Sequence, residues 1–285
     1  MNVTLPKKEK LNARDIIVYT ISIIVCIIAI VVIGLSYYFG SDELDRLITI
    51  GGSSLTQEDI DYQLLLSNFD NIFQNQVEES NVTAEIKKVD ENQPTVYTYY
   101  TNNETEKGNY ELNLNIPYIN IDNDTIKSFN EEIKKTFEAK AENTLQSKNQ
   151  SIIYNVQYQA TMQNDILSLI IKATLKQNTD AQRVIMQTYN YDLKNNKEIS
   201  LEEMLNYKNL NVEGVEDRIK EEITTQQKRV NDLKSLGYDI FERNPDNDMY
   251  KVENTKTFFV KDGNIYIIYP YGNDGLTSEY DLVIV

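Results

Sequence analysis

Several residue types on which catalytic chemistry depends are missing or scarce in this sequence. Its 285 residues include no histidine, no tryptophan and a single cysteine, Cys26. Without histidine the chain can form no Ser-His-Asp triad, no Cys-His dyad and no HExxH zinc site. Neither glycine-rich phosphate loop, GxxxxGKS/T or GxGxxG, is present. These absences predict a protein that is not an enzyme and that holds no metal or cofactor.

Charged side chains are absent from residues 16–39, a run of 24 residues near the N-terminus. A helix of that length, rising about 1.5 Å per residue, spans the roughly 30 Å hydrocarbon core of a bilayer with some tilt. Basic residues precede the run and acidic residues follow it: Lys7, Lys8, Lys10 and Arg14, then Asp42, Glu43 and Asp45. By the positive-inside rule, we expect residues 1–15 to form a cytoplasmic tail, 16–39 a single transmembrane helix in contact with lipid, and the rest to lie outside the cell membrane.

A cleaved signal peptide is the alternative interpretation of this run. Signal peptides have apolar cores of about 7–15 residues, which is shorter than the run here, although Gly51, Gly52 and Ser53 offer small residues for cleavage. Cys26 follows two large apolar residues, so we interpret it as a membrane cysteine and not as a lipidation site. The length of the run favours an uncleaved anchor.

Acidic side chains outnumber basic ones after the anchor. Residues 1–15 carry four basic and two acidic side chains, a net charge of +2. Since the net charge of the whole chain is −16, residues 16–285 have a net charge of −18. A domain this acidic repels nucleic acid and anionic lipid headgroups and attracts a cationic partner. The alternative is that the charge only keeps the domain soluble.

The composition also indicates the kind of cell. With Cys26 inside the apolar run, the outer part can form no disulfide, whereas secreted eukaryotic domains often depend on them. Asn, Lys, Ile and Tyr are abundant. This combination is typical of a bacterium with an AT-rich genome.

Hydrophobic spacing predicts the elements of the outer part. A juxtamembrane helix over residues 58–79 and a polar connector over 80–94 complete the segment 40–94. From residue 95 onward, period-two alternation predicts strands over 110–118, 152–160, 167–175, 184–193, 257–260, 265–269 and 280–285. Helical spacing predicts long helices over 124–147 and 212–236, and Ser200 with Glu203 forms a capping box before a short helix. Asp262-Gly263 predicts a type I′ hairpin turn.

These elements predict an α+β fold: an N-terminal transmembrane helix followed by a mostly antiparallel sheet packed with two long helices. The outer domain covers residues 95–285. It is either one domain or two subdomains, 95–192 and 193–285, each with one long helix against its strands.

Acidic residues offer two further possibilities. A pair of carboxylates would suit a cell-wall glycosidase, but the sequence singles out no pair. Asp122-Asn123-Asp124 begins like a calcium loop, but Ile126 takes the next ligand position and no glycine follows. We therefore expect Asp122 or Asp124 to be a helix N-cap.

Twenty tyrosines are the most suggestive feature of the side chains. Tyrosine combines an apolar face with a polar tip and is enriched in binding surfaces. A turn-rich loop over residues 269–275 lies between two apolar strands, and loops of this kind often carry function. The predicted partner-binding residues are Tyr269, Tyr271, Asn273 and Asp274. The alternative is that the tyrosines alternate between core and surface in ordinary strands.

The order of the parts resembles the extracytoplasmic domain of anti-sigma-V factor (RsiV-type) proteins, and the uncharacterised N-terminal modules of some peptidoglycan deacetylases (PdaC-type). The resemblance covers about residues 95–285. It is carried by residues 114–120 (LNIPYIN), 129–133 (FNEEI), 189–194 (YNYDLK), 198–201 (EISL), and by 258–259, 262–263 and 268–271 (FF, DG, IYPY).

The resemblance implies an α+β receptor-like module at the cell surface, in a family with a member that binds lysozyme. Sigma-factor inhibition does not carry over, because 15 cytoplasmic residues are too few for a helical clamp. Deacetylase activity does not carry over either, since the deacetylase domain with its metal-binding histidines is missing. We expect a non-catalytic binding or sensing domain for a cationic extracellular protein such as lysozyme or for a cell-wall component. A structural or assembly partner in the envelope is the alternative, and a carboxylate-dependent cell-wall enzyme a third reading.

Overall fold

The computed structural model describes residues 57–106, 110–146, 151–272 and 276–285. The predicted cytoplasmic tail and transmembrane run, and the candidate residues Asn273 and Asp274, lie outside these ranges. Within them, no helix is both long and apolar enough to cross a bilayer. The chain divides into two units, Met1–Gln63 and Leu64–Val285. Of the first, only the beginning of helix α3 (Gln57–Asn68) is described.

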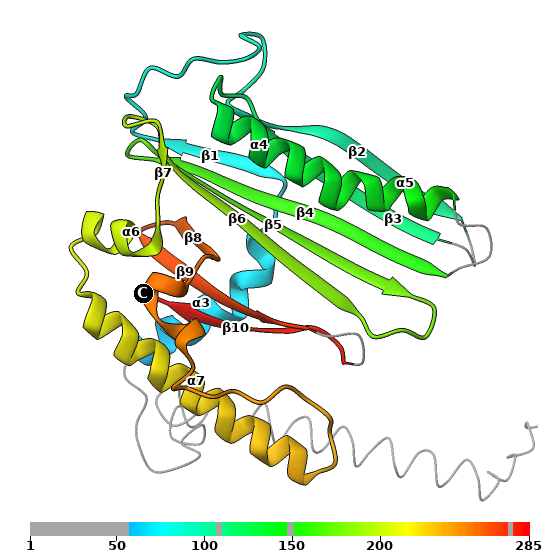
Figure 1. The fold of residues 1–285 in the computed structure, drawn as a ribbon, viewed down its shortest axis with the longest axis vertical. Coiled ribbons are helices and arrows are strands. Elements are labelled where there is room, and N and C mark those ends of the chain that lie inside the picture. The colour runs from blue at the N-terminus through cyan, green and yellow to red at the C-terminus, as the bar shows by residue number, and fades with distance from the viewer. Residues whose placement is uncertain (1–56, 107–109, 147–150, 273–275) are drawn as a thin grey trace, which may run out of the picture. The chain divides into compact units, whose positions relative to one another are not determined.

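A seven-stranded sheet dominates the second unit (Figure 1). Its strands follow the order β2-β3-β4-β5-β6-β7, and neighbours pair antiparallel except β3 with β4. Strand β1 pairs parallel with the end of β4 that β3 leaves unpaired. The strands are β1 (Gln76–Ser80), β2 (Val96–Glu106), β3 (Tyr110–Ile119), β4 (Ile152–Gln163), β5 (Ile166–Gln177), β6 (Arg183–Asp192) and β7 (Lys197–Glu198).

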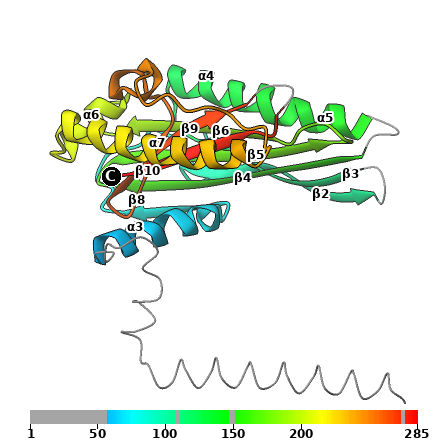
Figure 2. The same ribbon diagram turned by 90° about the horizontal axis from the view of Figure 1, so that it is seen from below.

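The first long helix covers one face of this sheet, as Figure 2 shows. It consists of α4 (Asp124–Ile133), a π-helical turn η2 (Lys134–Glu138) and α5 (Ala139–Gln146), close to the predicted bounds. Most of its predicted apolar stripe is buried against the strands: Ile126, Phe129, Ile133, Phe137 and Ala141.

The predicted N-cap of this helix is off by one residue. Asn123 caps it, because its backbone is extended and its Oδ1 accepts hydrogen bonds from Thr125 N at 2.9 Å and Ile126 N at 3.4 Å. Asp122 is occupied instead by ion pairs with Lys87 and Lys127. Asp124 is the first helical residue and not the cap.

A second, three-stranded sheet forms from the C-terminal residues, in the order β10-β9-β8. Its hairpin turn is as predicted, with φ of 50° at Asp262 and 87° at Gly263, which suit the type I′ turn. The second long helix, α7, and the short helix α6 with its capping box share a core with this sheet. The elements are α6 (Leu201–Tyr207), α7 (Val212–Ser235), η3 (Asp248–Tyr250), η4 (Val252–Asn254), β8 (Phe258–Lys261), β9 (Asn264–Tyr271) and β10 (Glu279–Ile284).

Buried polar groups join the two sheets. Ser168 Oγ accepts a hydrogen bond from Val260 N at 2.9 Å, and Thr161 Oγ1 donates to Val260 O at 2.6 Å. Asn190 Nδ2 donates to Phe258 O at 2.8 Å. Because Ser168 and Asn190 alternate with residues that face α4 and α5, strand β8 lies on the opposite face of the large sheet. The α+β class and the mostly antiparallel pairing agree with the prediction.

The predicted helix over 58–79 is wrong in its second half. Helix α3 ends at Asn68, a 3-10 turn η1 covers Phe69–Ile72, and residues 76–80 form β1. Tertiary contacts explain the change. Phe69 is 1% exposed and stacks on Tyr266, with ring centroids 5.8 Å apart. Asn75, at φ 54°, then turns the chain into the sheet. The large sheet thus begins earlier than the predicted start at residue 95.

Candidate functional site

Tyr269, the first predicted partner-binding residue, lies in the core. It is 3% exposed, and its hydroxyl lies 3.1 Å from Thr255 Oγ1. Burial raises the pKa of Tyr269 to about 12. The reason is the packing of its strand: Tyr269 shares a core with helices α6 and α7, and its ring packs edge to face on Tyr250, with centroids 4.9 Å apart. Tyr269 therefore cannot contact a partner, contrary to the prediction.

Tyr271, the second predicted residue, belongs to a buried ionic cluster. Its hydroxyl donates to Asp281 Oδ2 at 2.7 Å and lies 2.6 Å from the Tyr250 hydroxyl. The guanidinium carbon of Arg243 lies 4.4 Å from the centre of the Tyr271 ring. Burial, followed by the charge of Asp281, raises the pKa of Tyr271. The half-buried ring is committed to contacts within the protein.

Arg243 is the centre of this cluster, which we call the Arg243 cluster: Arg243, Asp281, Glu279, Tyr271 and Tyr250. Arg243 Nε and Nη2 donate to the two oxygens of Asp281 at 3.1 and 3.0 Å, and Nη2 lies 2.7 Å from Glu279 Oε2. Burial disfavours the charged guanidinium, but the two carboxylates outweigh it and raise the pKa of Arg243. The cluster fastens the segment after α7 to strands β9 and β10, which is a structural role.

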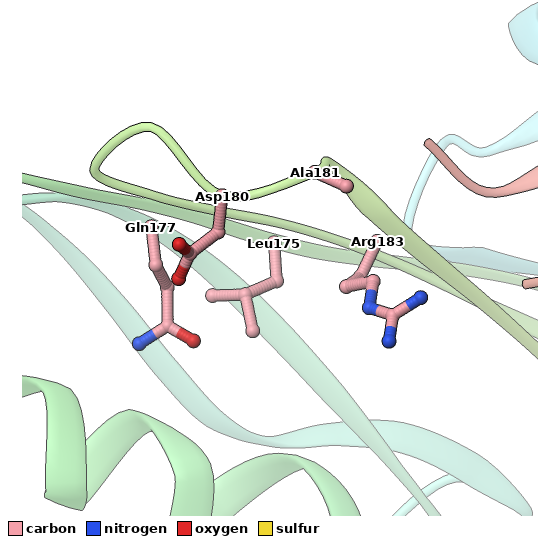
Figure 3. Close-up of a pocket in the computed structure, with 5 residues that line it drawn as sticks. All are labelled: Leu175, Gln177, Asp180, Ala181 and Arg183. Carbon is pink, nitrogen blue, oxygen red and sulfur yellow. The ribbon is translucent and has the colours of Figure 1, made fainter. Parts of the chain in front are cut away.

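A pocket of about 380 Å³ lies on the β5–β6 hairpin. Leu175, Gln177, Asp180, Ala181 and Arg183 line it, and the side chains of Leu175, Gln177 and Arg183 project to the same side of the hairpin (Figure 3). The residue before β10 also reaches this hairpin, because Ser278 N donates to Gln182 O at 2.8 Å. One acid, one amide and one guanidinium over an apolar side chain suit polar recognition.

A second, smaller pocket of about 250 Å³ lies between α7 and η3. Its lysines are engaged in ion pairs, Lys220 with Asp246 at 2.6 Å and Lys251 with Asp248 at 2.7 Å. Across the described ranges, no group of three or more Cys, Asp or Glu side chains is arranged to hold a metal ion.

Three half-buried tyrosines gather on strands β2 and β3, and we call Tyr97, Tyr99 and Tyr118 the tyrosine patch. The ring centroid of Tyr118 lies 5.6 Å from that of Tyr97 and 6.1 Å from that of Tyr99. Tyr99 is the extra residue of a β-bulge, without a partner on β3. The periodicity of the sequence does not reveal this patch. The run YTYY at 97–100 is the signal that could have located it.

The tyrosine patch already binds a cation of the protein itself. Lys134 Nζ lies 5.5 Å from the ring centre of Tyr99 and 5.7 Å from that of Tyr118, within cation–π range. Two carboxylates flank the patch: Glu138 accepts a hydrogen bond from the Tyr99 hydroxyl, and Glu131 lies 3.4 Å from Lys134. Burial, then Glu138, raises the pKa of Tyr99. Ring faces beside carboxylates favour ammonium and guanidinium groups.

Comparison with known proteins adds a likeness to a solved structure. No protein-family model matches the chain, and no curated protein matches its sequence. The crystal structure of a DUF3298 family protein from Pseudomonas aeruginosa PAO1 is similar, with 10% sequence identity and a TM-score of 0.36. The match covers 70% of this chain and 90% of that chain. At this level of similarity, function has to be argued from the residues of the chain itself.

Proposed function

We propose that this chain is a single-pass membrane protein of a bacterial envelope, whose outer domain binds or senses a cationic extracellular protein and performs no catalysis. The resemblance to the extracytoplasmic modules of anti-sigma-V factors, one of which binds lysozyme, supports a receptor-like role of this kind. The uncharged run over 16–39 and its flanking charges support the anchor, with residues 1–15 inside and the domain outside.

The tyrosine patch is the observation that carries the proposed binding role. It offers ring faces and carboxylates at one place on the surface, and it holds an ammonium group of its own. A cation over an exposed ring contributes about 0.5–1 kcal/mol, and more when the contact excludes water. The net charge of −18 beyond residue 15 adds a long-range attraction that speeds the encounter. A cell-wall component is the second candidate ligand, and the polar pocket on the β5–β6 hairpin suits it.

Lysozyme is a suitable cationic probe for this function. We expect the full chain in detergent to bind immobilised lysozyme at low ionic strength and to release it as salt is added. At 0.1 M salt, the attraction between exposed charges more than about 10 Å apart is largely screened. Absence of binding even at the lowest salt would contradict the proposal.

The tyrosine patch can be tested in the same assay. The Tyr97 ring is half-buried and packs on Tyr118, and its hydroxyl makes no hydrogen bond within the described ranges, so Tyr97→Ala should leave the fold intact and weaken lysozyme binding about threefold or more. Tyr238, which is 60% exposed after the end of α7, provides the matched control, and Tyr238→Ala should bind as the unchanged protein does. Equal losses in both variants would exclude the patch as the site.

A further inference from the structure

Strand β2 has one open edge. It is 11 residues long, twice the usual strand length, and pairs with β3 along one side. Along its other side, no backbone group in the described ranges hydrogen-bonds to residues 97–106. Figure 1 shows β2 at the margin of the large sheet. An edge of this kind presents a row of N–H and C=O groups that can pair with another chain.

Most natural edge strands are protected against such pairing, and the protection of β2 is confined to a bulge and two glutamates, Glu104 and Glu106. Lysine, proline and short length are the common devices, and β2 contains neither lysine, arginine nor proline. A bulge between Thr98 and Tyr100 is its one irregularity. Beyond it, residues 101–106 run in unbroken register with residues 115–110 of β3. This regular half of the edge is long enough to take up a partner strand of about six residues.

The charge of this half selects the partner. Glu104 and Glu106 on β2 and Glu111 on β3 are exposed, and neither strand contains a basic residue. Opposite charges on neighbouring strands stabilise their pairing, while like charges oppose it. A second copy of the same edge would bring further glutamates and is disfavoured. A strand with basic side chains matches this edge, and the tyrosine patch lies at the other end of β2.

We propose that β2 takes up an extended basic segment of the partner as an additional strand, by main-chain hydrogen bonds along residues 101–106. The side chains of that segment pair with Glu104 and Glu106. This inference rests on the proposed binding of a cationic protein and specifies how the partner is held. Strand addition of this kind obtains affinity from the backbone and specificity from alternate side chains.

A synthetic octapeptide of alternating lysine and valine is a direct probe. We expect it to slow hydrogen exchange of the β2 amides in the full chain by about tenfold or more at saturating peptide, because newly paired N–H groups exchange only when the added strand opens. An octapeptide of the same length and alternation, with glutamate in place of lysine, should give no protection. Absence of protection by the lysine peptide, or protection confined to other segments, would overturn the inference.

Charge reversal distinguishes local pairing with Glu104 and Glu106 from the long-range attraction of the protein's total negative charge. The double variant Glu104→Lys with Glu106→Lys should lower the affinity for the lysine peptide at least tenfold. The control, Glu213→Lys with Glu221→Lys on the exposed side of α7, changes the net charge by the same amount and should bind nearly normally. Equal weakening in both would overturn the inference.

Lysozyme binding distinguishes the two proposals. If lysozyme binds the full chain while the lysine peptide leaves β2 unprotected, the strand-addition mode is wrong and the proposed function stands. If the peptide protects β2 while lysozyme does not bind, strand addition stands and lysozyme-like proteins are excluded as the partner.

Discussion

Arg243 and Asp281 lie 38 positions apart in the chain and meet in the interior. Both are nearly fully buried, Arg243 at 7% and Asp281 at 5% exposure. A buried ion pair is tolerated only when its remaining donors and acceptors are satisfied, and here Tyr271, Glu279 and the carbonyl of Phe241 satisfy them. This requirement explains why Tyr271 faces inward although it precedes a turn-rich loop.

Removal of the Asp281 carboxylate should show how much the Arg243–Asp281 ion pair matters for stability. Asp281→Ala leaves the guanidinium of Arg243 buried beside Glu279 alone, so the free energy of unfolding should fall by about 3–5 kcal/mol. Glu279→Ala is the matched control, since its side chain is 27% exposed and Asp281 still neutralises Arg243. Urea unfolding of the full chain in detergent, followed by circular dichroism, measures both. A loss for Asp281→Ala no larger than that for Glu279→Ala would contradict a buried, charge-neutralising role.

At the scale of elements, periodicity is a good guide wherever one face of an element is buried. Strands β3, β4 and β5 and helix α7 lie close to their predicted bounds, because alternation and helical spacing record which side faces the core. Strand β2, which no pattern predicted, and residues 69–80 are exceptions. Phe69 and Phe73 have helical spacing, and their rings pack edge to face on each other. Phe69 also stacks on Tyr266 of strand β9, a contact that the sequence pattern does not record.

Asp165 of the β4–β5 turn holds the start of the connector before β2. Asp165 is 6% exposed and accepts hydrogen bonds from Thr83 N at 2.5 Å, Thr83 Oγ1 at 2.7 Å and Ala84 N at 2.8 Å. These bonds to Thr83 and Ala84, together with Lys194, lower the pKa of Asp165. The connector is thus tied to the sheet by a carboxylate that has to be ionised.

This dependence predicts a pH effect. The pKa of Asp165 is lower in the folded state than its value of about 3.9 in the unfolded chain. Ionised Asp165 therefore stabilises the fold above about pH 4, and the contribution is lost as pH falls through the folded-state pKa. Asp165→Asn should be less stable than the unchanged protein at pH 7, with a difference that shrinks below pH 4.

Urea midpoints measured between pH 7 and pH 2 test this effect. Asp122→Asn serves as the control: Lys87 and Lys127 lower the pKa of Asp122 to about 2, but the pair is exposed, so its effect on stability should be smaller. A stability difference for Asp165→Asn that does not change with pH would show that its ionisation is unimportant.

At the scale of the whole molecule, charge is divided along the chain. A basic tail, an uncharged run and a strongly acidic domain follow one another. Such an order suits a domain that is displayed on the outer side of a membrane and kept soluble by its negative charge. The open edge of β2 fits this setting, because a cationic partner would be drawn toward it before pairing.

Membrane attachment through residues 16–39 is directly testable. We expect the full chain to stay in the membrane pellet after alkaline carbonate extraction, and added protease to degrade the domain in intact cells while sparing the N-terminal tail. Deletion of residues 16–39 should move the protein to the soluble fraction, because no other stretch of the sequence is as long and free of charge. Recovery of the full chain in the soluble fraction would contradict the anchor.

Local spacing in the sequence was enough for the α+β class, the capping box at Ser200 and the hairpin turn at Asp262-Gly263, since each depends on residues a few positions apart. Tertiary structure decided the rest. The inward position of Tyr269 follows from the packing of its side of β9 against α6 and α7, and the tyrosine patch from a bulge that meets Lys134 of a helix packed on the sheet. Such contacts join residues far apart in the chain, and no local pattern records them.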